Sequence, residues 1–343
     1  MKRRTFLSTM GLTLSSSYLP AASANPRRVI KPRRLESGDT VVLVNPAGAT
    51  FSRVDAYVAA KHLESLKLKV REGNHLFDRR GYLAGSDTDR AADINAQFAD
   101  NSVAGLIALR GGWGCARILD LLDYDSIRRQ PKVFMGFSDI TALHMAIHSQ
   151  TGLVTFHGPV GSSNWTSFTT ESVRRLLLEG KAPVFSNPAA GKLQPAPPSH
   201  RVRTIREGRA RGPLLGGNLS VLAAIMGSNY LPDWDGAILF LEDVGEEIYR
   251  IDRMLTQLSL AGVLGRISGL VFGHCTDCTP GSSFGSLTLD EVLEDHVLPL
   301  EIPAWRGAMI GHIDDQFTLP QGIQAEIDAA PGTIRLLEPA VRM

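Results

Sequence analysis

The first half of the chain alternates short apolar runs with segments of helical spacing. Three runs of mostly apolar residues are followed by glycine or a turn sequence, which is typical of buried strands, and they lie at 40–44, 105–109 and 133–135. Apolar residues recur at helical spacing in four segments, at 54–68, 87–98, 116–122 and 140–148. Strands that alternate with helices over short links predict a parallel sheet covered on both faces.

This pattern breaks after Gly180 and resumes near Arg211. Several prolines lie between these points without apolar periodicity, so we interpret residues 181–210 as a partly extended linker. Further strands are predicted at 237–241, 270–272, 305–310 and, as a pair, within 323–334, and helices at 218–226, 251–260 and 289–297. The sequence therefore predicts a two-domain α/β protein, with an N-terminal parallel-sheet domain at 35–165 and a smaller C-terminal α/β domain at 211–335.

Residues 1–24 have the composition of a targeting segment rather than of a domain. Arg3-Arg4-Thr5-Phe6-Leu7 has the paired arginines of a twin-arginine export signal, and Ala22-Ser23-Ala24 offers a cleavage site. The apolar run between them is too short, and too rich in Ser and Thr, to span a bilayer. We expect export to the periplasm, with no stable membrane insertion after the segment is removed. An uncleaved N-terminus is the alternative and leaves a cytoplasmic location open.

Charge and length narrow the function classes. The 343 residues carry 36 Lys and Arg against 35 Asp and Glu, so there is no basic excess that would indicate nucleic-acid binding. The length exceeds what one hydrophobic core normally serves, which favours two domains. Three cysteines exclude a disulfide scaffold. For the Cys-x-x-Cys pair of Cys275 and Cys278, a disulfide, a metal site and two plain thiols all remain open.

Gly136-Phe137-Ser138-Asp139 is the most informative short motif. No His-Glu-x-x-His, Ser-x-x-Lys or P-loop sequence occurs. In this motif an apolar strand leads directly into a serine and a helix follows at once, as in a nucleophile elbow. The helix N-terminus would favour a developing oxyanion there. The structural alternative is that Ser138 or Asp139 merely caps the helix.

Two further predicted strand ends carry chemically useful side chains. The run at 239–241 leads into Glu242, and the run at 308–310 leads through a glycine into His312. The carboxyl ends of strands form the ligand crevice of open α/β sheets, so a serine, a carboxylate and an imidazole could converge there. The alternatives are a surface salt bridge for Glu242 and a turn hydrogen bond for His312.

Six stretches of the chain resemble one family when they are taken together and in order. They are Tyr-Leu-Ala-Gly-Ser-Asp at 82–87 with Arg-Ala-Ala-Asp at 90–93, Arg-Gly-Gly-Trp-Gly at 110–114, Gly-Phe-Ser-Asp-Ile-Thr-Ala-Leu-His at 136–144, Gly-Gly-Asn-Leu-Ser at 216–220, Leu-Glu-Asp at 241–243 with Tyr-Arg-Ile-Asp-Arg-Met-Leu at 249–255, and Gly-His at 311–312 with Leu-Pro-Gln-Gly at 319–322. This set resembles the LD-carboxypeptidases, the murein tetrapeptide carboxypeptidases, from residue 35 to the C-terminus.

The resemblance implies a serine peptidase that needs neither metal nor cofactor, with its site between the two domains. It implies that Ser138 is the nucleophile, His312 the general base and Glu242 the residue that orients His312. The backbone N–H groups of Asp139 and Gly112 would form the oxyanion hole. The implied substrate is a peptidoglycan stem tetrapeptide that loses its terminal D-Ala, and the implied assembly is a homodimer.

A carboxypeptidase must also hold a free carboxylate, and Arg110 is a candidate clamp, with a structural salt bridge as its alternative role. The chain departs from the family in its apparent export signal and in Trp113, which replaces the usual tyrosine. Two other functions stay open. One is a related serine peptidase acting on a peptidyl-nucleotide antibiotic, with Trp113 or Trp165 stacking on the base. The other is a periplasmic binding protein without catalysis.

Overall fold

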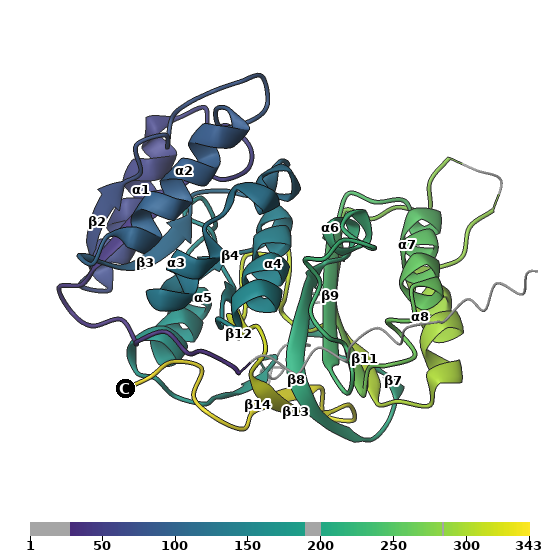
Figure 1. Cartoon of the computed structure of the whole chain (residues 1–343). Coiled ribbons are helices and arrows are strands. Elements are labelled where there is room, and N and C mark those ends of the chain that lie inside the picture. The colour runs from purple at the N-terminus through teal and green to yellow at the C-terminus, as the bar shows by residue number, and fades with distance from the viewer. Residues whose placement is uncertain (1–27, 189–199, 283–284) are drawn as a thin grey trace, which may run out of the picture.

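The computed structural model describes residues 28–188, 200–282 and 285–343, and these form two α/β lobes that lie side by side (Figure 1). The export signal predicted at 1–24 lies outside the described residues. Within the described ranges, no helix is both long enough and apolar enough to cross a membrane. The α/β class and the two-domain organisation agree with the sequence prediction.

The first sheet has six strands in the order β12-β5-β4-β3-β1-β2. Five are parallel, and β12 joins the edge antiparallel to β5. The strand bounds are β1 Thr40–Val44, β2 Lys69–Glu72, β3 Val103–Ala108, β4 Val133–Gly136, β5 Phe156–His157 and β12 Leu319–Pro320. The central strands are buried on both faces, which explains their continuous apolar sequences.

Helices cover both faces of this sheet. Helix α1 packs on one face through Ala59 and Leu63, and α2 packs on the other through Ile94 and Phe98. Helix α2 begins after Ser86, whose hydroxyl accepts a hydrogen bond from the Asp89 N–H. The helices of this part are α1 Arg53–Ser65, α2 Asp87–Ala99, the 3₁₀ helix η1 Cys115–Leu121, α3 Tyr124–Arg129, the 3₁₀ turn η2 Ser138–Ile140, α4 Thr141–Thr151, α5 Ser167–Val173 and the π-helical turn η3 Arg174–Leu178.

The second sheet has eight strands in the order β6-β14-β13-β8-β9-β10-β11-β7, with β8 to β11 parallel. The strand bounds are β6 Val184–Ser186, β7 Arg203–Arg206, β8 Arg209–Asn218, β9 Ile238–Val244, β10 Gly269–Thr276, β11 Ala304–Arg306, β13 Gln324–Asp328 and β14 Thr333–Leu336. The helices of this part are α6 Leu219–Ala224, α7 Ile248–Leu260, α8 Leu289–Val297 and the 3₁₀ turn η5 Leu298–Leu300.

Two sequence predictions are corrected here. The segment at 181–210, interpreted as a linker, contributes β6 and β7, which form the two edges of the second sheet. The strand predicted at 305–310 ends at Arg306, because the next residue, Gly307, has a φ of 91° and leaves the extended conformation. His312 therefore follows a loop rather than a strand.

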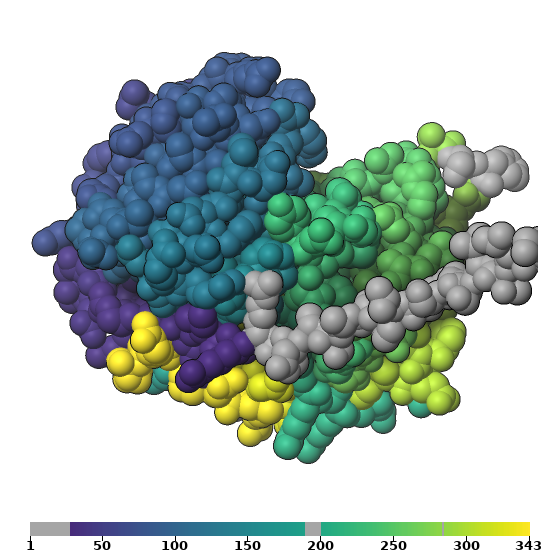
Figure 2. Space-filling view, in the orientation of Figure 1, coloured from purple at the N-terminus to yellow at the C-terminus, as the bar shows by residue number. Residues whose placement is uncertain are grey.

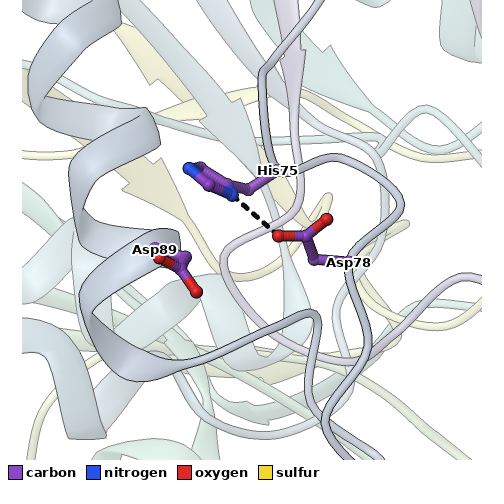
Figure 3. A group of neighbouring side chains, drawn as sticks. All are labelled: His75, Asp78 and Asp89. Carbon is purple, nitrogen blue, oxygen red and sulfur yellow. Dashed lines mark hydrogen bonds and ion pairs between the residues drawn. The ribbon is translucent and has the colours of Figure 1, made fainter.

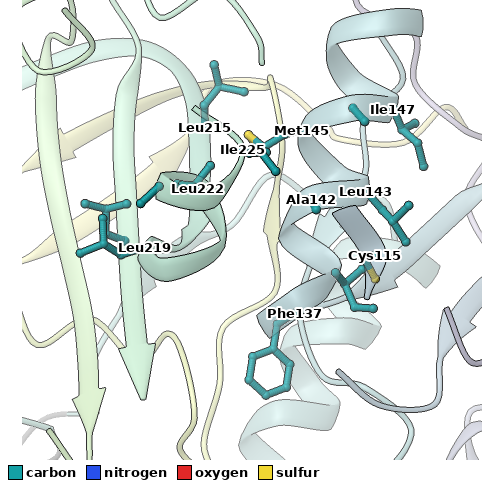
Figure 4. Close-up of a cluster of buried hydrophobic side chains, with 14 of the residues drawn as sticks. Cys115, Phe137, Ala142, Leu143, Met145, Ile147, Leu215, Leu219, Leu222 and Ile225 are labelled. Carbon is teal, nitrogen blue, oxygen red and sulfur yellow. The ribbon is translucent and has the colours of Figure 1, made fainter. Parts of the chain in front are cut away.

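Two apolar clusters each contain residues of both lobes. Figure 4 shows α4, with Met145 and Leu143, near the β8–α6 segment, which carries Leu215, Leu222 and Ile225. The C-terminal residues, yellow in Figure 2, also lie against the purple start of the described chain. The Arg342 N–H donates to the Pro32 carbonyl at 2.8 Å. These contacts fix how the first lobe sits on the second.

Candidate active site

Ser138 stands in a strained turn at the carboxyl end of β4. Its φ is 64°, in the left-handed region that costs a residue with a Cβ about 1–2 kcal/mol. Neighbouring glycines make room for this turn. A Cβ placed on Gly111 would lie 2.9 Å from the Ser138 Cβ, and one on Gly136 would lie 3.0 Å from side-chain atoms of Ala108 and Ile140. Such strain, held by the surrounding structure, is common at functional sites.

The capping alternative for this motif is not what the structure contains. Neither Ser138 nor Asp139 makes a side-chain cap, since the N-cap residues are Phe137 for η2 and Ile140 for α4. The Asp139 N–H is among the first N–H groups of η2, and such groups have no partner within their own helix.

The structure brings Ser138, His312 and Glu242 into one hydrogen-bonded chain. His312 Nε2 lies 3.1 Å from Ser138 Oγ, and His312 Nδ1 lies 2.8 Å from Glu242 Oε2. A carboxylate only accepts hydrogen bonds, so Nδ1 carries the hydrogen and the lone pair of Nε2 faces the serine hydroxyl. This is the order of contacts found in serine-hydrolase triads.

Both Glu242 and His312 are held in place by the residues around them. Glu242 is fully buried near the end of β9, so its carboxylate has little freedom. The Thr276 hydroxyl donates to the His312 carbonyl at 2.9 Å, and the Phe137 ring packs edge-on to the imidazole with centroids 4.8 Å apart. Gly311 has a φ of 110°, and a Cβ there would come within 2.8 Å of Glu242 Oε2. Among the described residues Glu242 makes no surface salt bridge, because it is fully buried and Arg250 pairs with Glu246 instead.

The glycine-rich loop at 110–114 forms the wall opposite the nucleophile. Asp139 Oδ2 accepts a hydrogen bond from the Cys115 N–H at 2.8 Å, and burial raises the pKa of this carboxyl. Gly112 has a φ of 120° and packs against Gly48, where a Cβ would come within 3.2 Å of backbone. The Asp139 side chain therefore anchors the loop that carries Gly112.

Arg90 is a positioning residue that was not predicted from the sequence. Its side chain is fully buried and donates to the carbonyls of Pro46 and Gly114, and it also contacts Asp87. It thus joins the loop after β1 to the loop after β3. The pattern that marks it is an arginine on the apolar face of a predicted helix, because a buried guanidinium needs several acceptors.

A cleft of about 500 Å³ opens over the triad. It is lined by residues from both lobes, among them Arg110, Gly112, Ser138, Asn164, His312 and Gln316. Arg110 donates to the Ala49 carbonyl at 2.9 Å, and no ion pair of Arg110 occurs among the described residues. Its remaining N–H groups are thus available to a ligand carboxylate, and the salt-bridge alternative for Arg110 is not found in this part of the chain.

Other polar groups lie outside the cleft. His75 Nδ1 lies 2.7 Å from Asp78 Oδ2 (Figure 3). The Ser86 hydroxyl donates to Asp89 at 2.6 Å. Ligand atoms of His75, Asp78 and Asp89 lie within 4.8 Å of one another, and these side chains also take part in the hydrogen bonds above. Of the three roles left open for Cys275 and Cys278, the structure contains the disulfide, while Cys115 is buried and free.

The comparisons with known proteins identify the family. The LD-carboxypeptidase N-terminal domain matches residues 41–158, and the LD-carboxypeptidase C-terminal domain matches residues 211–327. The chain belongs to the LD-carboxypeptidase family. It is accordingly a hydrolase of the carboxypeptidase kind, as the resemblance of its six motifs implied.

Individual relatives agree with this assignment. A probable murein peptide carboxypeptidase of Bacillus subtilis is 38% identical over 88% of this chain and 93% of its own. A muramoyltetrapeptide carboxypeptidase from Oxalobacter formigenes has a similar structure, with a TM-score of 0.71 and 29% identity over 87% of this chain and 97% of that one. The microcin C7 self-immunity protein MccF, known from Escherichia coli, gives a TM-score of 0.82 and 26% identity over 91% of this chain and 100% of that one.

Proposed function

We propose that this LD-carboxypeptidase removes the terminal D-Ala from peptidoglycan stem tetrapeptides through an acyl-enzyme on Ser138. The observation that carries the proposal is the hydrogen-bonded chain from Glu242 through His312 to Ser138, because Ser138 and His312 line a cleft of about 500 Å³. Relatives with the same fold bear the names of murein peptide and muramoyltetrapeptide carboxypeptidases.

In the proposed reaction the Ser138 oxygen attacks the carbonyl carbon of the bond between the diamino acid and D-Ala. His312 Nε2 takes the hydroxyl proton, and its contact with Glu242 stabilises the imidazolium that forms. The N–H groups of Asp139 and Gly112 are assigned to the oxyanion. His312 then gives its proton to the leaving amine of D-Ala, and a water molecule activated by His312 hydrolyses the ester.

We assign Arg110 to the free carboxylate of D-Ala. Its guanidinium is half-buried at the cleft, where it donates to one backbone carbonyl and has N–H groups left over. A guanidinium binds a carboxylate through two parallel hydrogen bonds, which would select substrates with a free C-terminus. An Arg110→Lys variant keeps the charge but loses the planar fork, so it should raise KM for D-Ala release more than it lowers kcat.

We also propose that the protein acts in the periplasm as a homodimer. The twin-arginine sequence at 3–7 supports export, and the family resemblance supports the dimer. There the enzyme would act on newly released fragments or on the sacculus itself. Fractionation of cells that express the full chain tests the location, and sedimentation of the purified protein tests the dimer.

The second candidate is a peptidase acting on a peptidyl-nucleotide antibiotic, favoured by the structural likeness to MccF. Such an enzyme needs an accessible aromatic side chain for the base. Trp165, one of the two predicted candidates, is buried and donates its Nε1–H to the Val160 carbonyl, so it does not serve. Trp113 is accessible. A binding protein without catalysis has no need of the strained serine in contact with His312.

One set of assays separates these functions. Purified protein and its Ser138→Ala, Glu242→Ala and His312→Ala variants are incubated with defined tetrapeptides, and the products are weighed by mass spectrometry. Loss of one D-Ala residue with the native chain, and not with Ser138→Ala, supports the proposal. Full release by Ser138→Ala would refute it. Labelling of Ser138 by a fluorophosphonate probe distinguishes an enzyme from a binding protein.

A further inference from the structure

Two aromatic side chains stand exposed beside the active site. Tyr82 and Trp113 keep 68% and 51% of their surface accessible, and their rings meet edge to face with centroids 5.8 Å apart. Burying an aromatic side chain usually stabilises a protein by about 1.5–3 kcal/mol, so an exposed pair of this size forgoes that gain. Paired exposed aromatics of this kind mark an interaction site.

The pair is held rigidly. Trp113 lies between two glycines with positive φ, and the carbonyl of Gly114 accepts a hydrogen bond from Arg90 at 2.9 Å. The Tyr82 carbonyl accepts a hydrogen bond from the Ala49 N–H at 2.8 Å. Because Arg90 also donates to the Pro46 carbonyl, the backbone of both loops is tied to the loop after β1. A ligand would therefore meet a backbone surface that is already formed.

Polar donors flank the pair. The Arg117 guanidinium lies 5.8 Å from the centre of the Trp113 ring and is fixed to Asp87 by hydrogen bonds from Nε and Nη2. A guanidinium has five N–H donors, so Arg117 keeps donors beyond those that Asp87 uses. Flat aromatic surface beside fixed hydrogen-bond donors is the chemistry that recognises sugars, because pyranose C–H faces pack on rings while hydroxyl and acetamido groups take hydrogen bonds.

The distance to the nucleophile fits a sugar attached to the stem peptide. Gly111 contacts Ser138, and the Trp113 Cα lies at most about 7 Å further along the chain from it. Trp113 itself does not line the cleft, which ends at Gly112 on this loop. In a stem tetrapeptide, three residues separate the scissile bond from the sugar, or roughly 10 Å when they are extended.

We propose that Tyr82 and Trp113, with Arg117, form a subsite for the amino-sugar part of a muropeptide whose stem tetrapeptide occupies the cleft. This inference rests on the proposed function and deepens it. The preferred substrate is then a tetrapeptide still joined to its glycan, rather than the free peptide. Trp113, which replaces the family's usual tyrosine, supplies the larger face.

The test compares two substrates that differ only in the sugar. D-Ala release is measured for a free tetrapeptide and for the same peptide carrying the N-acetylglucosaminyl–N-acetylmuramyl disaccharide. The native chain should have the higher kcat/KM for the sugar-linked substrate. Trp113→Ala should lower the ratio of the two kcat/KM values about tenfold, while Trp113→Phe should keep most of the ratio. Tyr82→Ala should also lower the ratio. Tyr57 is an exposed tyrosine on α1, and Tyr57→Ala, the matched control, should leave the ratio unchanged.

A binding measurement supports the kinetics. In a Ser138→Ala background the disaccharide-tetrapeptide should quench tryptophan fluorescence and bind more tightly than the free peptide, and Trp113→Phe should remove most of the quenching but not the binding preference. If Trp113→Ala leaves the ratio of the two kcat/KM values unchanged, whether or not both values fall, the proposal is overturned. A change in sedimentation with an unchanged ratio would also overturn it, since the pair would then contact a second copy. If the native chain releases D-Ala from neither substrate, the proposed function fails, whereas the binding comparison still tests the subsite.

Discussion

The side chain of Asp139 accepts a hydrogen bond from the backbone N–H of Cys115 across 2.8 Å. This contact joins the turn that carries Ser138 to the glycine-rich loop that faces it. The family resemblance implied a role only for the backbone N–H of Asp139, but its buried carboxyl also sets the spacing between the nucleophile and Gly112.

Removing the Asp139 carboxyl should therefore slow catalysis. We expect Asp139→Ala to lower kcat for D-Ala release by about 10- to 100-fold, because small displacements of reacting groups have effects of this size. Asp139→Asn should be milder, since an amide oxygen can still accept the hydrogen bond from Cys115. Steady-state kinetics of the two variants with one tetrapeptide check this. Equal losses in both variants would show that the hydrogen bond to Cys115 is not what matters.

The strained backbone at Ser138 should make the native serine costly for stability. Glycine adopts a φ of 64° without the Cβ penalty, so Ser138→Gly should unfold at a higher urea concentration than Ser138→Ala, by up to about 1 kcal/mol in free energy. Both variants should be inactive. Equilibrium urea unfolding measures the difference, and a less stable Ser138→Gly protein would argue against strain at this position.

Glu242 should matter for catalysis through its charge and not only through its shape. Glu242→Gln fits the same buried space but does not stabilise the imidazolium of His312 electrostatically. We expect kcat/KM to fall by about 10³-fold or more. The comparison is made at one pH with the native chain, and circular dichroism verifies the fold. Activity within tenfold of the native value would mean that His312 is oriented by its other contacts.

Buried histidines should make the fold sensitive to mild acid. Burial lowers the pKa of His144 to about 4, and burial also lowers the pKa of His148 and of His157. A histidine in the unfolded chain has a pKa of about 6.5, so below this pH it binds a proton in the unfolded chain but not in its buried, folded position. Stability should thus fall as the pH drops from 6.5 towards 4, with His144 contributing up to about 3 kcal/mol.

Urea unfolding at pH 7 and at pH 5 tests this dependence. The native chain should lose more stability between these values than His144→Gln, which has no imidazole to protonate. The His144→Gln protein is expected to be less stable at pH 7, because it gives up the contacts of His144 with the Gly136 carbonyl and the Thr155 hydroxyl. Identical losses in the two proteins would show that His144 does not titrate as its burial predicts.

The strands that were predicted correctly are those with a continuous apolar sequence, which indicates burial on both faces. Residues 40–44 are apolar enough to indicate a strand covered on both sides, and β1 has these bounds. Lys69–Glu72 was missed because β2 is an edge strand with charged, mostly exposed side chains. β12 was missed because it is only two residues long, including a proline, and is defined by its pairing with β5 rather than by its own pattern.

The residues of the site also differ in whether a local sequence pattern indicates them. The turn at Ser138 was indicated by its local sequence, because a strand, a serine and a helix follow one another directly. That His312 reaches Ser138 across 174 positions has no local signature. Its place after a predicted strand left this contact open, and only the resemblance to a family implied it. The Arg90 and Thr276 contacts depend on which backbone carbonyls the fold places beside them, so no spacing along the chain reports them.

The short strand β12 ties the base to the lobe of the nucleophile. Shortly after His312 the chain leaves the second lobe, and Leu319 and Pro320 pair with β5 in the first sheet before β13 returns to the second. A hinge motion that moves the lobes apart would have to break this pairing. We therefore expect the catalytic residues to be in place before substrate binds, with the cleft open throughout the reaction. Cutting the protein into its two lobes would separate His312 from the β12–β5 pairing that aligns it.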